Sequence, residues 1–374
     1  MSAWQRPTDF DLTPHLETLE AMIEMERVLA AEERQRASLL HKPLDRPPVI
    51  ITQQNDCQPT NQSLSLPDWP AISYRQAFRS PQHLLVHELQ QVYEGLLLGD
   101  DRIYSVGVNF GAAIGPSMFG CEIVQFKDDL PQVIPLEVDD VGLALIRGGV
   151  PDLNAGLGVR VWETLDQWQA WLAPYPRLSQ AIHLEMPEVL GPFELAGHII
   201  GKDIFTWVVD DPELLHDVLQ VMTDTCIAIA SRFRAQTAAP ANIHYRHGCR
   251  IPASAHIQDT LAGQMTGQMY RRFAARYNAQ ISAALGNVSI AFCVPNERVF
   301  RQLSATSGVT VIQCGEDIGP HFDTCLQAAR ERTNGLIWSW TTQRSLPEVT
   351  TGVIHKVIAP DWPTARRLAG QPGE

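Results

Sequence analysis

The sequence predicts an α/β fold in which parallel strands close into a barrel. Predicted strands and helices alternate with short connections along the second half of the chain, which is typical of parallel strands joined by crossover helices. Several strands also carry one bulky apolar face and one small or polar face. That pattern suits a barrel interior with a polar mouth better than a doubly wound sheet. The 374 residues, 45% of them hydrophobic, are enough for one large barrel.

The stretch Asn287–Cys293 shows the strand pattern clearly. Val288, Ile290 and Phe292 are bulky and apolar, whereas the residues between them are small or polar. Because successive side chains of a strand point to opposite faces, the Cys293 thiol is expected on the inner face at the last strand position. Parallel α/β barrels carry their catalytic groups at this end of the strands.

The N-terminal part is expected to form a helical extension over residues 1–46, ahead of a single barrel domain over 47–374. Residues 16–40 are charged and amphipathic with helical periodicity. The apolar run at 47–52 predicts the first strand. Residues 53–73 are rich in Asn, Gln, Pro and Ser and have no periodicity, which predicts a long surface loop.

The next elements follow from capping and alternation. A serine before a proline predicts a capped helix over 81–98. Alternation predicts strands at 103–110 and 181–188, with Asn109 and Glu185 on their polar faces near the ends. Helical periodicity predicts helices between and after these strands, at 138–148, 158–172, 193–205 and 213–234.

The second half continues the same alternation. A strand is predicted at 242–247, with His244 and Arg246 on its polar face, and residues 248–260 are expected to form a loop. After these, helices and strands are predicted in turn at 266–285, 297–304, 309–314, 320–332, 335–341 and 363–368.

Composition excludes several classes of protein. The formal charge is −13 and the isoelectric point is about 5.4, so binding to nucleic-acid phosphates is not expected. The cysteine count of seven is odd and no C-x-x-C motif occurs, which argues against a disulfide framework and for a reducing compartment. The N-terminus lacks an apolar signal core, and no apolar run is long enough to span a membrane. A cytoplasmic protein without membrane contact is expected.

Five residues are predicted to share one site. Asn109, Glu185, His244, Arg246 and Cys293 each occupy the inner face near the end of a predicted strand. In a parallel barrel these strand ends converge on one mouth, so residues far apart in the sequence become neighbours. The alternative is that they are polar residues that fill the barrel and satisfy each other locally.

A metal site is a further alternative. Zinc binds imidazole and thiolate groups, and His244, His247, Cys249, His256 and Cys293 supply both. The spacing argues against a simple site, because residues three apart on a strand point to opposite faces. Without a metal, His247 and Cys249 are ordinary loop or packing residues.

Asp259 precedes the predicted helix 266–285. It is either a capping aspartate or a carboxylate facing the mouth, able to hold an N–H-rich or cationic ligand. Glu194 and His198 lie beyond the strand that contains Glu185. His198 is either a satisfied buried histidine or a substrate-binding residue.

Several stretches resemble the uroporphyrinogen decarboxylase superfamily, whose barrel also includes methylcobamide:thiol methyltransferases. The resemblance extends over residues 47–340 and includes features of a divergent bacterial branch. It implies a (β/α)8 TIM-type barrel with the site at the C-terminal mouth. The stretches that carry it are Gly99–Asp101, Asn109–Gly111, Gly191–Ala196, Asp211–His216, Asp259–Tyr270 and Ser289–Cys293.

Two departures from the superfamily bear on function. Decarboxylases of the family carry an arginine-rich motif that binds substrate carboxylates, whereas Ile51–Cys57 at this place contains no arginine. The methyltransferases hold zinc with His-x-Cys and a later cysteine. Here Cys293 matches the first cysteine, Ala291 replaces the histidine, and 335–341 has no cysteine. A substitute ligand could come from His244, His247 or Cys249. Otherwise the site is metal-free, or catalysis has been lost.

The resemblance implies methyl transfer linked to a corrinoid cofactor or a corrinoid partner protein. Cys293 would be a zinc ligand or reactive thiol, Asp259 a substrate-orienting carboxylate, and His244 a ligand or general base. One alternative is a decarboxylase for a uroporphyrinogen-like or smaller carboxylated substrate, held by Arg246. Another is a non-catalytic barrel that binds a tetrapyrrole, a corrinoid or a protein. A small-molecule substrate is expected in the first two cases, and a homodimer is an open alternative.

Overall fold

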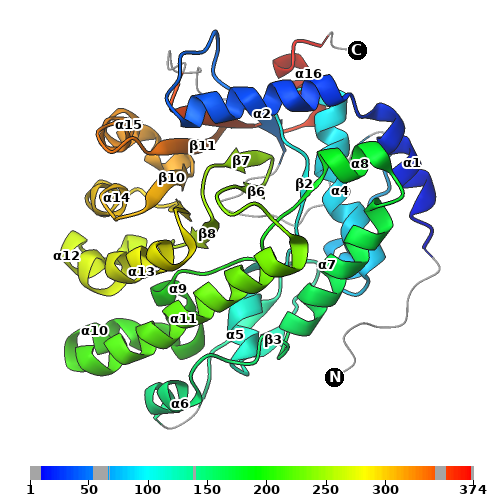
Figure 1. The fold of residues 1–374 in the computed structure, drawn as a ribbon. Coiled ribbons are helices and arrows are strands. Elements are labelled where there is room, and N and C mark those ends of the chain that lie inside the picture. Colours follow the sequence, from blue (N-terminus) through cyan, green and yellow to red (C-terminus); the bar gives the residue numbers. More distant parts are fainter. Residues whose placement is uncertain (1–9, 54–65, 67, 138–139, 342–350, 372–374) are drawn as a thin grey trace.

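A computed structural model of the chain describes residues 10–53, 66, 68–137, 140–341 and 351–371. Most of the predicted loop 53–73 therefore lies outside the described residues. Strands occupy the centre and helices surround them (Figure 1). The main sheet is parallel throughout and has six strands. They are ordered β1 (Val49–Thr52), β12 (Val353–Ile358), β11 (Gly335–Thr341), β10 (Val309–Cys314), β9 (Val288–Ala291) and β8 (Ala255–Gln258).

Two further strands form a short parallel pair, β2 (Ser105–Val106) with β5 (His183–Leu184). Single contacts link this pair to the main sheet. A bridge joins Leu190 to Gln258, and the Asp101 amide donates to the Val49 carbonyl at 3.1 Å. The predicted α/β fold with parallel strands is confirmed. Among the described residues, no continuous ladder closes these eight strands into a ring, so the closed barrel stays a prediction.

The outer face of the sheet is covered by helices and carries most of the apolar core. Val288, Ile290 and Phe292 belong to this core, as the alternation of Asn287–Cys293 predicts. The main covering helices are α4 (Pro81–Leu98), α7 (Gly158–Leu172), α9 (Pro192–Ile200), α11 (Pro212–Thr237), α13 (Arg276–Leu285), α14 (Glu297–Ser304), α15 (Phe322–Arg330) and α16 (Trp362–Leu368).

Shorter elements connect these parts. A two-stranded antiparallel excursion is formed by β3 (Glu122–Val124) and β4 (Gln132–Ile134). The short helices are α3 (Tyr74–Ala77), α5 (Ile114–Met118), α6 (Val141–Gly148), α8 (Pro176–Ala181), α10 (Ile204–Asp210) and α12 (Gly267–Tyr270). A π-helical stretch at Arg271–Ala275 joins α12 to α13, so the helix predicted at 266–285 is nearly continuous.

The strand predicted at 242–247 is present, but it does not belong to the parallel sheet, and the loop predicted at 248–260 is wrong because it contains two strands. Residues 244–251 form an antiparallel hairpin, β6 (His244–Arg246) with β7 (Cys249–Ile251), and the parallel strand of the main sheet is β8 instead. The turn consists of His247 and Gly248, both with positive φ, as a two-residue hairpin turn requires. The sequence prediction missed this turn because histidine is an uncommon residue there. It also missed β12 entirely.

The hairpin packs on the inner face of the sheet, which we define as the face opposite the covering helices. Apolar residues of four strands form a second cluster there with Cys249 and Ile251 of β7. Leu39 joins the same cluster. These inner residues of the sheet are Ile50, Val311, Ile337 and Ile354. The inner face is thus apolar where the hairpin packs, and polar residues follow farther along the strands.

The N-terminal extension is two helices rather than one, α1 (Thr13–Met22) and α2 (Met25–Leu39), because Ile23 is extended. Helix α2 is tied to the rest of the fold. The Gln35 amide donates to the carbonyls of Asp101 and Gly248, at 2.7 and 2.9 Å. No helix of the described ranges is long and apolar enough to cross a membrane.

Candidate active site

Asp259 directly follows β8, and its carboxyl group is completely buried. Its amide donates to the Ala291 carbonyl of β9 at 3.0 Å, which fixes the residue at the carboxyl end of two adjacent strands. Oδ2 accepts a hydrogen bond from Asn278 Nδ2 at 2.9 Å, whereas Oδ1 has no partner among the described residues. Burial raises the pKa of Asp259 to about 6, although interactions with the Asn278 amide and the Tyr270 hydroxyl oppose this.

Glu194, on α9, supplies a second buried carboxyl group beside Asp259. Its Oε2 accepts a hydrogen bond from the amide of Leu261, two residues after Asp259. Burial raises the pKa of Glu194 to about 8, and the charges of Asp259 and Glu188 add to this effect. His198 Nε2 lies 3.9 Å from Glu194, and burial lowers the pKa of His198. Glu194 is therefore mostly a neutral acid at pH 7.

Gly191 allows α9 to approach this pair of carboxyls. A Cβ atom at Gly191 would stand 3.2 Å from Asp259 Oδ1 and 3.3 Å from the Gln258 carbonyl. Pro192 then begins α9 at a position where its missing amide hydrogen costs nothing. The Gly-Pro pair thus brings the first turn of α9, which contains Glu194, against the end of β8.

Deeper on the inner face lies a network of charged groups. Glu185 Oε1 accepts hydrogen bonds from Ser105 Oγ at 2.6 Å and from the His247 amide at 2.7 Å. Arg246 forms an ion pair with Glu188, and Lys356 Nζ donates to the His247 carbonyl at 2.8 Å.

Glu88, on α4, belongs to the same buried region. Its Oε2 accepts from the Gly107 amide at 3.3 Å. Burial raises the pKa of Glu88 to about 8, and the charge of Glu185 raises it further. Glu88 is thus a second carboxyl group that is mostly neutral at pH 7.

Ser289 of β9 joins two buried histidines. Its Oγ lies 2.8 Å from His244 Nε2 and 2.8 Å from His256 Nδ1. Burial lowers the pKa of His244 to about 3 and that of His256 well below its usual value. Both rings are therefore neutral near pH 7, which makes His244 a buried hydrogen-bonding residue here.

The predicted site residues thus fall into two groups. Glu185 and Arg246 lie in the charged network, and Asp259 and His198 lie at the carboxyl end of β8. Asn109 is separate, because its Oδ1 accepts from the Gly111 amide at 3.2 Å and its carbonyl accepts from Tyr74 Oη at 2.6 Å. Asn109 thereby shapes the turn after β2.

Cys293 lies two residues past β9 and is partly buried. It is disulfide-bonded, whereas the odd cysteine count and the lack of a C-x-x-C motif argued against a disulfide framework. The other described cysteines carry thiols that are outside any disulfide: Cys121, Cys226, Cys249, Cys314 and Cys325. A reactive thiol at Cys293 therefore requires reduction of this disulfide.

The proposed metal ligands are not gathered in one place. His244 is held at Ser289, four residues before Cys293 on a strand that rises about 3.3 Å per residue. His247 lies in the β6–β7 turn near Glu185. Within the described ranges, no group of three or more His, Cys, Asp or Glu side chains is arranged to hold a metal ion. The set Cys293, His244 and His247 stays a prediction without a geometry that supports it.

Some residues of the site were missed from the sequence. Glu88 sits on an amphipathic helix among polar residues, where nothing local distinguishes it from a surface carboxylate. Lys356 lies on β12, a strand that the sequence patterns do not predict. Glu188 belongs to the site because it forms an ion pair with Arg246. Asn278 shares a helix face with Tyr270 and Ile281, and this spacing predicts only an ordinary buried helix face. Only tertiary structure reveals these contacts.

The carboxyl pair Asp259–Glu194 has the properties of an acid–base set. Two buried carboxyls whose pKa values are raised to different extents can hold and exchange a proton near neutral pH. Oδ1 of Asp259, which accepts no hydrogen bond from the described part of the chain, is the oxygen that is left to carry that proton.

The family model for uroporphyrinogen decarboxylase (URO-D) matches residues 186–333. The matched segment runs from the end of the β5 strand region to the turn before β11, so it contains Glu188, Glu194, Asp259 and Cys293. Over these residues the match confirms the resemblance to the uroporphyrinogen decarboxylase superfamily, whereas the stretches at 99–101 and 109–111 lie outside it. A search among curated proteins found no match.

Proposed function

We propose that this chain, a uroporphyrinogen decarboxylase-like protein over residues 186–333, is a decarboxylase for a small carboxylated substrate. One observation carries the proposal. Asp259 is a fully buried carboxyl group with a raised pKa, one unpartnered oxygen among the described residues and an adjacent neutral carboxyl in Glu194. A decarboxylation needs a proton donor of this kind at the carbon that loses CO2.

In the proposed reaction the bond between the substrate carbon and its carboxylate breaks, and CO2 leaves. The electron pair of that bond remains on the carbon, where it takes the proton of Asp259 and forms a C–H bond. Asp259 is left ionised and regains a proton from Glu194, which water reprotonates. Asn278 holds the other oxygen of Asp259 at 2.9 Å and keeps the carboxyl in position.

The charges on the inner face limit the substrate. Arg246 and Lys356 are the cations of the described network, and Arg246 is already paired with Glu188. Glu185 and Glu188 lie in the same region, so a substrate with many carboxylates would meet repulsion. A substrate with one or two carboxylates agrees better with this balance than a uroporphyrinogen-like one.

The substitution Asp259→Asn tests the proposal. The substitution replaces the acid by an amide of nearly the same shape that cannot donate the proton. We therefore expect the rate of labelled CO2 release from a panel of 13C-carboxyl substrates to fall by about 10²-fold or more. Asp210→Asn, at the exposed end of α10, is the matched control and should leave the rate unchanged. Full activity of Asp259→Asn would overturn the role of Asp259 as proton donor.

Methyl transfer is the second candidate, and one observation favours it. Cys293 follows β9 and lies at the same end of the sheet as Asp259. The Asp259 amide donates a hydrogen bond to the carbonyl of Ala291, two residues before Cys293. After reduction, the Cys293 thiolate could hold zinc or attack a methyl group carried by a corrinoid protein. Zinc analysis of reduced protein, compared with Cys293→Ser, tests this candidate. One zinc per chain that disappears in the variant supports it, and no zinc in either protein removes the zinc-dependent form.

A further inference from the structure

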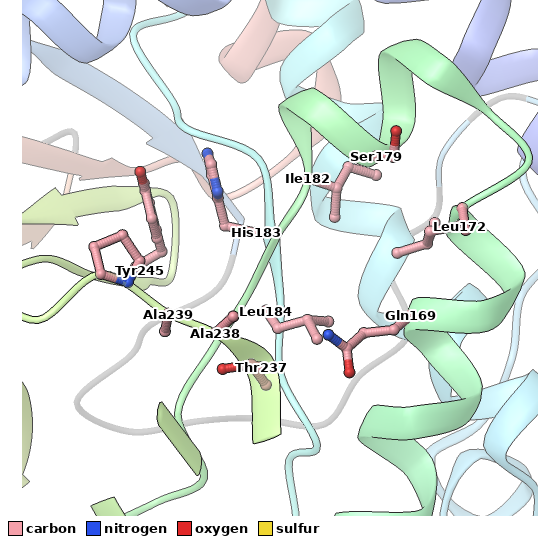
Figure 2. A pocket seen from close by; sticks show the side chains of 12 residues that line it. Gln169, Leu172, Ser179, Ile182, His183, Leu184, Thr237, Ala238, Ala239 and Tyr245 are labelled. Atoms are coloured by element: carbon pink, nitrogen blue, oxygen red, sulfur yellow. The ribbon is translucent and has the colours of Figure 1, made fainter. Parts of the chain in front are cut away.

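We propose a second ligand site at the N-terminal end of β5, which takes a small planar aromatic cation such as an aryl amidinium or a protonated aromatic amine. The site is a pocket of about 330 Å³. That volume lies in the range of small-molecule sites. The residues that line it are Gln169, Leu172, Ala173, Ser179, Ile182, His183, Leu184, Thr237, Ala238, Ala239, Pro240 and Tyr245 (Figure 2).

This pocket is separate from the candidate active site. It lies where β5 begins, whereas Asp259 follows the end of β8. The two strands run in the same direction, as the parallel Leu190–Gln258 bridge shows. The pocket and Asp259 therefore lie at opposite ends of the strands, and the proposal does not rest on the proposed function.

A pair of stacked rings forms one side of the pocket. The rings of His183 and Tyr245 lie 3.6 Å apart, centroid to centroid, and their planes differ by 4°. Figure 2 shows these rings on one side of the view, with Gln169, Leu172 and Ser179 on the other. The stack is held in place by Glu32 of α2, which lies 3.3 Å from His183 Nε2. A planar aromatic ligand can extend such a stack.

Three helices end at the pocket. The last residues of α7 and α11, Leu172 and Thr237, line it, and α8 contributes Ser179 in its last turn. A helix C-terminus carries a partial negative charge from carbonyls that lack intrahelical partners. Three such ends around one pocket favour a ligand that is positively charged or rich in N–H donors.

The hydroxyl groups that line the pocket also favour a ligand that donates hydrogen bonds. Ser179 Oγ donates to the Pro176 carbonyl at 3.1 Å, and Thr237 Oγ1 donates to the Phe233 carbonyl at 2.8 Å. Each hydroxyl has one hydrogen, so both oxygens are left only as acceptors. The side-chain amide of Gln169 also lines the pocket and offers a further acceptor together with two donors.

The charges near the pocket agree with a cationic ligand. None of the twelve lining residues is a lysine or an arginine. Burial raises the pKa of Tyr245. The charge of Glu32 raises it further, whereas the charge and hydrogen bond of Arg250 lower it, so charges of both signs lie near this ring. The preference of the pocket for a cation therefore comes from the helix C-termini and the hydroxyl acceptors.

Three probes of equal size test the assignment: benzamidinium, benzamide and benzoate. They differ in charge and in N–H donors but share one planar ring. Each is titrated into the full chain, and binding is followed by the NMR shifts of the Gln169 side-chain amide and the His183 ring. We expect benzamidinium to bind about tenfold or more tightly than benzoate, with benzamide between them. Equal affinities, or shifts that occur elsewhere on the chain, would overturn the proposal.

Two variants sharpen the test. Tyr245→Leu removes one ring of the stack and should weaken benzamidinium binding about 3- to 10-fold, in line with aromatic pair energies. Ala239→Lys adds a cation at the partly exposed rim and should reverse the order, so that benzoate binds better than benzamidinium. Gln220→Lys, at an exposed position of α11 outside the lining, is the matched control and should preserve the order. If Ala239→Lys keeps the original order while folded, the pocket is not the binding site.

Discussion

At the scale of single residues, Asp259 combines high burial with an incomplete set of hydrogen bonds. Its pKa is about 6, against an ordinary value of 3.8, because burial disfavours the ionised form. Between these pH values the folded protein holds more protons than the unfolded chain. The unfolding free energy contributed by this group therefore falls as pH rises from about 4 to about 6 and stays low above that.

Replacing Asp259 with asparagine should remove this fall of the unfolding free energy with rising pH. A pKa difference of about 2 corresponds to about 3 kcal/mol, so Asp259→Asn should be more stable than the natural chain at pH 8 by up to about that amount. At pH 4 the two proteins should be nearly equal. Urea unfolding at both pH values measures the difference, with Asp210→Asn as the control. A variant that is less stable than the natural chain at pH 8 would contradict this account.

The same pair of carboxyls predicts a pH dependence of the reaction. If Asp259 donates the proton, the active form is the protonated one, and it is lost as pH rises through the pKa of about 6. Glu194, with a pKa of about 8, supplies protons over a higher range. The rate constant kcat should therefore decline from about pH 6 upward, and Glu194→Gln should steepen the decline. A rate that rises from pH 5 to pH 8 would show that the ionised carboxylate is the active form.

At the scale of elements, the β6–β7 hairpin determines what fills the inner face. Its turn places His247 and Gly248 at positive φ. A Cβ at Gly248 would lie 3.0 Å from Arg102 Cγ, in a buried region. Both the backbone conformation and the close contact therefore require glycine.

Gly248→Ala should lower the unfolding free energy by about 1–3 kcal/mol, because alanine is strained at this φ and contacts Arg102. Gly148→Ala is a matched glycine substitution at an exposed helical position with no atom near the new Cβ, and it should change stability by less than about 1 kcal/mol in the favourable direction. Chemical denaturation measures both variants. Equal effects would mean that the hairpin turn is not a constrained element.

Local patterns predict some elements and miss others. Alternation is a property of neighbouring residues, so Asn287–Cys293 and the strands β10 and β11 could be read directly. The hairpin at 244–251 also alternates, and alternation does not distinguish a parallel strand from an antiparallel one. That is why residues 242–247 were assigned to the parallel sheet and why His244 and Arg246 were placed at the mouth. Pairing partners, which are nonlocal, decide the difference.

At the scale of the whole molecule, the N-terminal extension is joined to the rest by a buried amide. Gln35 donates to the Asp101 and Gly248 carbonyls and accepts from the Arg250 amide at 2.8 Å. Leu39 of the same helix packs in the inner cluster. The extension predicted at 1–46 therefore contributes to the core that it covers.

Gln35→Leu should destabilise the protein by about 3 kcal/mol or more, since it leaves buried backbone groups without partners. Circular dichroism and tryptophan fluorescence should still report one common transition, because α2 and the sheet share a core. Gln327→Leu, on the exposed face of α15, is the control and should have little effect. An early separate transition in Gln35→Leu would show that the extension folds independently.

The α/β fold follows from sequence patterns, and a carboxylate facing the mouth is one of the two alternatives that they leave for Asp259. The paired carboxyl groups could not be predicted, because their pKa values depend on burial by α9 and α13, which are distant in sequence. The Cys293 disulfide is a similar case. An odd number of cysteines indicates free thiols on average and does not exclude one pairing.

The titration of the buried carboxyl pair tests the central claim most directly, since it needs no knowledge of the substrate. In protein labelled with 13C at aspartate and glutamate carboxyls, resonances that disappear in Asp259→Asn and Glu194→Gln identify the pair. We predict that the pair titrates with apparent pKa values of about 6 and about 8. If both groups titrate below about pH 4.5, they are ordinary carboxylates at neutral pH, and the proposed proton donor at the mouth does not exist.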